Sequence, residues 1–273
     1  MNQKEPILNS VLTEEQTKET KLRLIKAILM GNTGSGKTQS AITLPDKSKE
    51  KPLLLVDFDG RWETVRDEVD EGVVKVLELF DPDPSSPKAW DQAEDLRKEL
   101  WALVRRGELP FSGIIEDSLS MMARVAMNSA LLLDKKRGLG GAPAKQHWMP
   151  QIYFLVKHIN AMRALPCHYI LTSHFDVMVD EDDGKLKMLP KITRSLRTEL
   201  PSWFNEAYYC HHTQVKGERK YFWTTGGSGK YDFFKSTLNN KQKYWKDPIE
   251  INFDEPPVGF ERLMGLRFKD VDN

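Results

Sequence analysis

Residues 31–38 of the chain are Gly31-Asn32-Thr33-Gly34-Ser35-Gly36-Lys37-Thr38, and the predicted fold is built outward from this loop. The apolar run directly before it, residues 22–30, has the length and composition of a buried strand. A short helix is expected to begin at Lys37 and to end before Pro45, because proline disfavours helical backbone in the residue that precedes it. The sequence therefore predicts a strand, a glycine-rich turn and a helix in immediate succession.

The composition of this loop suits the binding of phosphate groups. Its glycines allow positive φ angles, so that backbone N–H groups can wrap around an anion, and the N-terminus of the following helix adds a partial positive charge. Lys37 would contact the β- and γ-phosphates of a nucleotide, and the Thr38 hydroxyl would bind Mg²⁺. We therefore predict a site for ATP and Mg²⁺. The residues predicted to form it are Gly31, Asn32, Thr33, Gly34, Ser35, Gly36, Lys37, Thr38 and Gln39.

Strand-like and helical segments alternate from residue 22 to residue 173. Further strands are predicted at residues 53–56, 73–79, 113–117 and 168–172. The helices predicted between them start at Pro87, with Ser86 as the cap, and cover residues 119–133 and 148–165. Two hairpins follow, at residues 177–189 and 208–225. This order predicts an α/β fold, a mostly parallel sheet flanked by helices with an antiparallel extension at its C-terminal end.

The 273-residue chain has 40 basic and 40 acidic side chains, so its net charge is zero and any nucleic-acid surface must be a local patch. Its two cysteines are far apart in sequence, which rules out a disulfide framework and suits a reducing cytoplasm. No apolar run is long enough to span a membrane, and we expect a cytoplasmic protein. We expect a flexible N-terminal arm at residues 1–20, one core at residues 21–255 and a tail at residues 256–273.

A phosphate-binding loop of this kind needs a carboxylate for Mg²⁺ at the end of a neighbouring strand. Asp117 ends the predicted strand at residues 113–117 and is our candidate, although it could instead cap the helix that follows. Glu116 should point to the opposite face of the sheet, because side chains alternate along a strand. It is therefore poorly aimed for catalysis.

The strand at residues 53–56 offers two further carboxylates where it ends. Asp57 and Asp59 can both reach the γ-phosphate, because the carboxyl ends of parallel strands meet at the ligand crevice. We choose Asp59 as the residue that orients the attacking water, with a role in the turn as the alternative. His174, just past the last strand of this series, is the candidate that contacts the γ-phosphate; a lone histidine there could instead be a packing residue.

The order of these motifs resembles the RecA-like P-loop ATPases, and more narrowly the phage-type family that includes single-strand-annealing recombination proteins. The motifs that carry the resemblance are residues 31–38, 54–60, 114–119, 170–174 and 231–236. The resemblance implies a RecA-like fold, ATP hydrolysis and a homo-oligomer with its sites between subunits. In that family the position matching Asp59 is usually a glutamate that activates water. The position matching His174 couples the γ-phosphate to DNA-binding loops, and the position matching Lys235 contacts ATP of the neighbouring subunit.

Three basic segments could bind single-stranded DNA. The first is a glycine-rich loop with Lys135, Lys136 and Arg137, and the second carries Lys191, Arg194 and Arg197. The third, residues 216–223, combines lysine and arginine with aromatic side chains that could stack on bases. Each segment could equally be a solvated loop. In a RecA-like assembly the first two would face the central channel, and we therefore predict that these two bind DNA.

We thus expect a RecA-like ATPase that forms a ring or a filament on single-stranded DNA and supports recombination, annealing or replication. The resemblance also implies a single-strand-binding protein as a partner. One alternative is a nucleotide-gated DNA-packaging or loading factor, which would bind ATP without turnover. The other is a small-molecule kinase, which would need an arginine-rich lid; Arg194 and Arg197 are the only nearby candidates for it.

Overall fold

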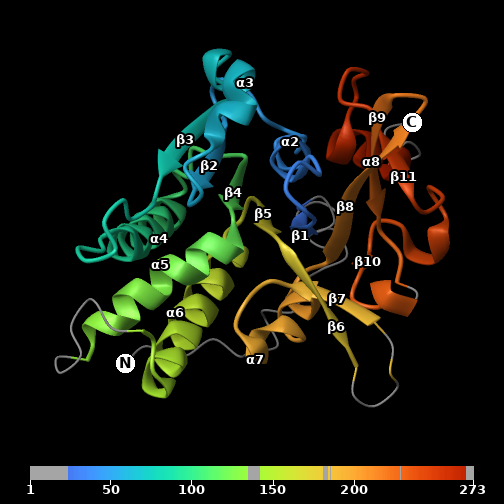
Figure 1. Ribbon diagram of the computed structural model, residues 1–273. Coiled ribbons are helices and arrows are strands. Elements are labelled where there is room, and N and C mark those ends of the chain that lie inside the picture. Colours follow the sequence, from blue (N-terminus) through green and yellow to red (C-terminus); the bar gives the residue numbers. More distant parts are fainter. Residues whose placement is uncertain (1–23, 135–141, 181–183, 185, 228, 269–273) are drawn as a thin grey trace, which may run out of the picture.

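The computed structural model describes residues 24–134, 142–180, 184, 186–227 and 229–268. A nine-stranded sheet runs through this part of the chain in the order β11-β9-β8-β1-β5-β4-β2-β3, with β10 paired to β8 (Figure 1). The strands are β1 (Lys26–Met30), β2 (Leu53–Asp57), β3 (Val74–Glu78), β4 (Gly113–Asp117), β5 (His168–Ser173), β8 (Glu206–Val215), β9 (Glu218–Thr224), β10 (Lys235–Ser236) and β11 (Ile249–Ile251). Those from β8 to β3 are parallel, while β9, β10 and β11 run antiparallel to their neighbours. The predicted α/β fold with an antiparallel extension is confirmed.

Helices cover both faces of this sheet (Figure 1). One core lies under α4 (Ala89–Arg106), α5 (Leu119–Leu132) and α6 (Lys145–Arg163), and includes Ile28 and Met30 of β1. The other lies under α2 (Lys37–Ala41) and α8 (Gly259–Phe268), and includes Ala27 and Leu29. All four strand residues are fully buried. Because both faces are covered, β1 needs apolar residues at successive positions, which explains the unbroken apolar run that precedes the glycine loop.

A separate hairpin leaves the sheet at the end of β5. It consists of β6 (Phe175–Val179) and β7 (Leu186–Pro190), which pair antiparallel, and it is followed by α7 (Arg194–Arg197). The remaining short elements are η3 (Trp62–Val65), α3 (Arg66–Asp70), η4 (Leu200–Trp203), η5 (Gly229–Tyr231) and η6 (Asn240–Gln242). Among the described residues, none of the helices combines the length and the apolar character that crossing a membrane requires.

Two helices begin at positions other than those expected. α4 starts at Ala89, and the cap predicted at Ser86 is supplied instead by Asp81, whose Oδ1 accepts the backbone N–H groups of Lys88 at 2.8 Å and Ala89 at 2.9 Å. A carboxylate several residues upstream thus replaces the local cap. α6 starts at Lys145, three residues early, because the His147 ring accepts the backbone N–H of Ala144 at 2.9 Å.

The core also continues past the boundary expected at residue 255. α8 lies within the segment predicted as a tail, and its Phe260 and Leu263 are fully buried. Phe260 stacks on Tyr208 of β8, with 5.7 Å between ring centroids. Residues 256–268 are therefore part of the packed domain. The arm predicted at residues 1–20 lies outside the described residues.

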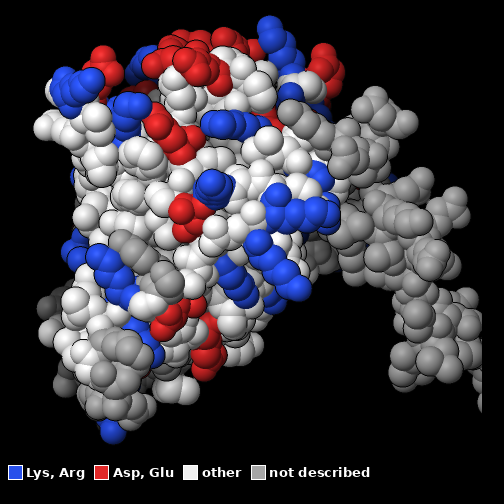
Figure 2. Space-filling model, turned by 90° about the vertical axis from the view of Figure 1, so that its right-hand side faces the viewer, with Lys and Arg blue, Asp and Glu red and all other residues white. Residues whose placement is uncertain are grey.

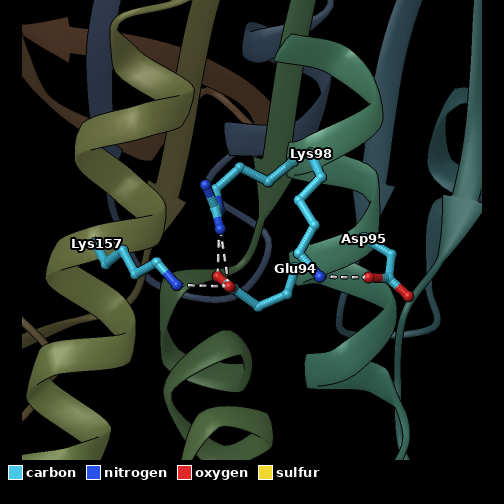
Figure 3. A network of polar contacts seen from close by, with 5 residues as sticks. Glu94, Asp95, Lys98 and Lys157 are labelled. Atoms are coloured by element: carbon cyan, nitrogen blue, oxygen red, sulfur yellow. Dashed lines mark hydrogen bonds and ion pairs between the residues drawn. The ribbon is translucent and has the colours of Figure 1, made fainter. Parts of the chain in front are cut away.

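Glu94 joins α4 to α6 on the outer side of the helical layer (Figure 3). Its carboxylate accepts hydrogen bonds from Arg97 of the same helix at 2.8 Å and from Lys157 of α6 at 2.9 Å. Burial alone would raise the pKa of Glu94, but the hydrogen bonds and charges of Arg97 and Lys157 outweigh it and lower the pKa to about 2. The ionised carboxylate therefore stabilises the fold.

Replacing Glu94 with glutamine should lower the free energy of unfolding by about 1 kcal/mol at pH 7, because both cations lose their charged partner. The folded-state pKa lies below the ordinary value of 4.5, so this contribution is complete above pH 4.5 and is lost as the pH falls toward 2. Urea unfolding of wild type and Glu94→Gln across this range measures the difference. The exposed Glu99 on the same helix supplies the control variant Glu99→Gln. A difference that stayed constant down to pH 2 would contradict this assignment.

Candidate nucleotide site

The loop between β1 and α2 has a backbone that only glycine can follow at several positions. Gly34 and Gly36 have φ angles of 75° and 78°, in the left-handed region that disfavours other residues. At Gly31 an added Cβ would lie 2.3 Å from Ser35 Oγ and 2.4 Å from the Cys210 carbonyl oxygen. The glycines predicted from the sequence are thus required by the turn itself, which curls the loop into a cradle at the end of β1.

Lys37 lies across this cradle and is buried. Its Nζ donates to the carbonyl oxygens of Gly31 at 3.1 Å and Asn32 at 2.9 Å. Burial lowers the pKa of Lys37, while nearby Cys210, Asp117 and Asp59 oppose the shift. The ammonium group therefore sits where phosphate oxygens could replace the two carbonyl partners.

Thr38 and Asp117 meet beside the cradle. Thr38 Oγ1, in the first turn of α2, donates to Asp117 Oδ2, and Thr172 Oγ1 of β5 donates to Asp117 Oδ1. Burial raises the pKa of Asp117, and the hydrogen bonds from Thr172 and Thr38 oppose this. A hydroxyl and a carboxylate side by side are the donor set that Mg²⁺ takes at a phosphate site.

These residues fit a triphosphate with Mg²⁺. Ser35 Oγ is buried within the cradle and has no hydrogen-bond partner among the described residues, so a polar ligand would satisfy it. The first backbone N–H groups of α2 have no acceptor inside the helix and face the same end of β1. Lys37 would hold the phosphates, and Thr38 with Asp117 would hold the metal ion.

The three carboxylates considered for catalysis occupy different surroundings. Asp57 is buried and accepts the backbone N–H groups of Asp59 at 2.9 Å and Arg61 at 2.6 Å, so it shapes the turn after β2. Asp59 turns into the cavity, where its Oδ1 accepts the Ser118 hydroxyl at 2.9 Å. Glu116 lies on the opposite face of β4, as predicted, and is fully buried.

Glu116 belongs to a closed network away from the cavity. Its Oε1 lies 2.6 Å from His158 Nε2, and its Oε2 accepts the Tyr169 hydroxyl at 2.5 Å. Both partners are fully buried. The network therefore fixes β4, β5 and α6 to one another, and Asp59 is the carboxylate placed to act on a ligand.

A cavity of about 240 Å³ is lined by most of the predicted residues, though not by Gly31 or Asn32. Its lining comprises Thr33, Gly34, Ser35, Gly36, Lys37, Thr38, Gln39, Asp59, Arg61, Thr64, Asp117 and His174. Burial lowers the pKa of His174, and the charge of Lys37 adds to this, which favours the neutral ring at neutral pH. Arg61 and Thr64 also line the cavity and were not predicted from the sequence; their position just past Gly60, in the turn after β2, is the signal that points to them.

Other predicted residues lie away from this cavity. Lys235 is exposed on β10, opposite Ala207 of β8, and its Nζ donates to the Ser202 carbonyl oxygen at 3.3 Å. Arg197 of α7 forms an ion pair with Asp176 at 3.1 Å. Arg194 belongs to the same helix, and Lys135, Lys136 and Arg137 lie outside the described residues. In the described part of the chain, no group of three or more His, Cys, Asp or Glu side chains could hold a metal ion.

The glycine cradle at the end of a central strand, the lysine across it and the Thr–Asp pair beside it define a P-loop nucleotide-binding site on a mostly parallel sheet. The AAA_24 family, described as an AAA domain, matches residues 23–232. Because this match spans most of the chain, the protein belongs to that family. It is therefore a member of the P-loop ATPase superfamily, whose proteins generally use ATP and Mg²⁺.

Comparison with known proteins adds little beyond the family. None of the curated proteins matches the chain. Among solved structures, the flagellar accessory protein FlaH from Methanocaldococcus jannaschii is similar, with 10% sequence identity, 87% of each chain covered and a TM-score of 0.45. This likeness is too loose to transfer a function or a partner.

Proposed function

We propose that the protein binds and hydrolyses MgATP in this cavity and uses the cycle to act on single-stranded DNA in recombination, annealing or replication. The observation that carries the proposal is the position of His174. It lines the nucleotide cavity and directly precedes the β6–β7 hairpin. Loss of the γ-phosphate on hydrolysis would therefore alter the contacts of His174 and with them the position of the base of that hairpin.

Different residues of the cavity carry out the separate tasks of hydrolysis. Lys37 and the loop N–H groups bind and orient the triphosphate, and Thr38 with Asp117 hold the metal ion, which supplies positive charge against the phosphate oxygens. Asp59 orients the attacking water and accepts its proton, with Ser118 fixing one carboxylate oxygen. Aspartate is one methylene shorter than the glutamate of similar proteins, so we expect modest turnover.

The hairpin is bonded to both sides of the cavity. The backbone N–H of Lys191, just past β7, donates to the His174 carbonyl oxygen at 2.8 Å. The Lys191 carbonyl oxygen in turn accepts the Ser120 hydroxyl at 3.2 Å, and Ser120 lies in the first turn of α5, three residues after Asp117. These bonds supply a physical connection between the nucleotide and the hairpin.

A groove of about 880 Å³ lies on the far side of this connection, between α5, α6 and α7. Its lining combines apolar side chains, among them Met127, Leu131 and the half-exposed Trp148, with the cations Arg124, Lys191 and Arg197, the last of which is paired with Asp176 of the same lining. Apolar and aromatic surfaces stack bases while cations neutralise the backbone, so this chemistry suits single-stranded DNA.

We also propose that the active form is a homo-oligomer. Lys235 is exposed and lies outside its own chain's nucleotide cavity, so it is free to approach the cavity of a neighbouring copy. The arginines and lysines of the groove would then line a shared path for DNA. A single-strand-binding protein remains a proposed partner on the sequence resemblance alone.

The test compares ATP turnover with and without oligo(dT). ATP turnover by wild type should rise several-fold with oligo(dT). The reason is that DNA in the groove would stabilise the conformation of the hairpin in which His174 contacts the γ-phosphate. Arg124→Ala combined with Lys191→Ala should lower the slope of log affinity against log salt by about 1.4, since each lost phosphate contact with a single strand removes about 0.7. The exposed Lys49 and Lys51, both replaced by alanine, serve as the control.

Three outcomes would contradict the proposal in different ways. ATP turnover that does not change when DNA is added would contradict coupling between DNA binding and hydrolysis. ATP binding without turnover would favour a nucleotide-gated packaging or loading factor. Phosphate transfer to a small molecule, without any effect of DNA, would favour a kinase with the groove as its second substrate pocket.

A further inference from the structure

A second basic surface lies well away from the groove between α5 and α6, on the face of the molecule that carries β9, β11 and α8. Figure 2 shows several Lys and Arg side chains across the middle of this face, with acidic side chains along its upper edge and some between and below the basic ones. The segment between β10 and β11 contributes Lys241, Lys243 and Lys246, which are all exposed. We call residues 239–246 the lysine turn; it reads Asn239-Asn240-Lys241-Gln242-Lys243-Tyr244-Trp245-Lys246 and contains no acidic residue.

The backbone of the lysine turn is held from inside. The buried Asn239 accepts the backbone N–H groups of Tyr244 at 2.9 Å and Trp245 at 3.2 Å through Oδ1, and donates to the Trp245 carbonyl oxygen at 2.8 Å. The Trp245 ring is buried, and its Nε1 donates to Thr225 Oγ1 at 3.1 Å. The turn is thus a fixed platform and not a loose loop.

The turn also adopts a backbone that its residues do not favour. Lys241 and Gln242 have consecutive φ angles of 57° and 52°, although neither is glycine. Such conformations persist where the surrounding bonds impose them, and they concentrate at functional sites. Here the pair includes Lys241, whose side chain is exposed.

One lysine of the turn and one arginine of α8 lie at the same aromatic ring. Lys243 Nζ lies 5.3 Å from the centroid of the Tyr244 ring, and the Arg267 guanidinium of α8 lies 4.6 Å from it. Arg267 also donates to the Tyr244 hydroxyl at 2.6 Å. Among the described residues, Lys241, Lys243 and Lys246 form no ion pair, so their charges are not neutralised within the chain.

The surface around the turn lacks the large exposed apolar side chains that a protein interface needs. Interface cores are rich in aromatic residues and poor in lysine. None of the exposed large apolar side chains of the described residues lies between residues 229 and 268. Three ammonium groups that form no ion pair among the described residues, on a fixed backbone and without large exposed apolar side chains, suit the repeated phosphates of a nucleic-acid backbone.

We propose that the lysine turn is a second contact surface for single-stranded nucleic acid, and that Lys241, Lys243 and Lys246 bind its phosphates. This proposal rests on the proposed action on single-stranded DNA and adds a place on the chain that none of the predicted DNA-binding segments includes. The hairpin and the turn are neighbours along this part of the chain, because η5 packs against β7 and lies four residues before β10, which leads into the turn.

The experiment measures binding of fluorescein-labelled oligo(dT) by anisotropy over a series of salt concentrations. The variant replaces Lys241, Lys243 and Lys246 with alanine, and the control replaces the exposed Lys49, Lys51 and Lys75. We expect the slope of log affinity against log salt to fall by about 2 in the variant, at about 0.7 for each lost contact, and to stay at the wild-type value in the control. Thermal melting checks that each protein is folded.

If the slope of log affinity against log salt is unchanged in the folded variant while wild type binds oligo(dT), the proposal that the lysine turn binds phosphates is wrong and the proposed function is unaffected. If that variant instead changed its sedimentation, the turn would be a contact with the acidic surface of a second copy, which also overturns the proposal. A lower salt slope in the variant, together with wild-type ATP turnover that does not change with DNA, would support the proposed contact at the lysine turn and contradict the proposed coupling of DNA binding to hydrolysis. A wild type that binds no oligo(dT) would contradict both.

Discussion

Replacing Lys37 with alanine should lower ATP turnover by about 10²- to 10³-fold, the size of effect expected when a preorganised group that stabilises developing charge is removed. Lys37 is buried across the loop, and its Nζ donates hydrogen bonds to the carbonyl oxygens of Gly31 and Asn32. Its ammonium group is thus positioned in advance, and no other lysine lines the cavity among the described residues. Steady-state phosphate release measures the loss.

The control for this variant must separate lost chemistry from lost folding. Lys47→Ala removes a partly buried lysine just past α2, where Nζ pairs with Glu261, and it should leave turnover within about twofold, because its side chain lies outside the cavity. Circular dichroism should show both variants folded. Turnover of the folded Lys37→Ala protein at the wild-type rate would remove the P-loop from the mechanism.

Replacing Asp59 with asparagine should lower the turnover number by about 10²-fold or more, while ATP affinity stays within a few-fold of wild type. Asparagine keeps the size of the side chain and can still contact Ser118, but it cannot accept a proton from water. The effect should therefore fall on the chemical step. Turnover and nucleotide affinity measured on the same preparation separate the two quantities.

Asp91→Asn, at an exposed position in the first turn of α4, is the matched control for the loss of one carboxylate. It should leave both turnover and affinity unchanged. If Asp59→Asn hydrolysed ATP as fast as wild type, another group would have to orient the water, and Asp59 would be a residue of the turn alone.

The glycine loop could be predicted from the sequence because its chemistry is local. Consecutive residues supply the turn, the lysine and the hydroxyl, and the strand before them shows the apolar run of a segment buried on both faces. The position of Asp117 could be predicted for a similar reason, since it ends a short apolar strand. Neither prediction required knowledge of the strand order, which is what brings the end of β4 close to α2.

The choice between Asp57 and Asp59 shows where sequence reasoning stopped. Both follow the same strand, and only the structure shows that Asp57 bonds to the backbone of the next turn while Asp59 contacts Ser118. The cap of α4 was mispredicted for the same physical reason. Asp81 reaches the helix from seven residues upstream of Lys88, and local patterns do not report such contacts.

The groove and the lysine turn could not be predicted, because each depends on segments brought together by tertiary packing. The groove joins α5 and α6 to residues after β7, and the turn owes its shape to the bonds of Asn239 and to Trp245 packing on Thr225. The boundary at residue 255 failed because the apolar residues of α8 are too few to show a period, yet Phe260 and Leu263 complete one core.

The claim on which the account depends most is that the cavity around Lys37 holds the triphosphate of MgATP. Isothermal titration of wild type and Lys37→Ala with a slowly hydrolysed ATP analogue and Mg²⁺ tests it most directly. The account predicts one site per chain in wild type, weakened at least about tenfold in the variant and in wild type without Mg²⁺. Equal binding by both proteins, with or without the metal ion, would place the nucleotide elsewhere and contradict the account.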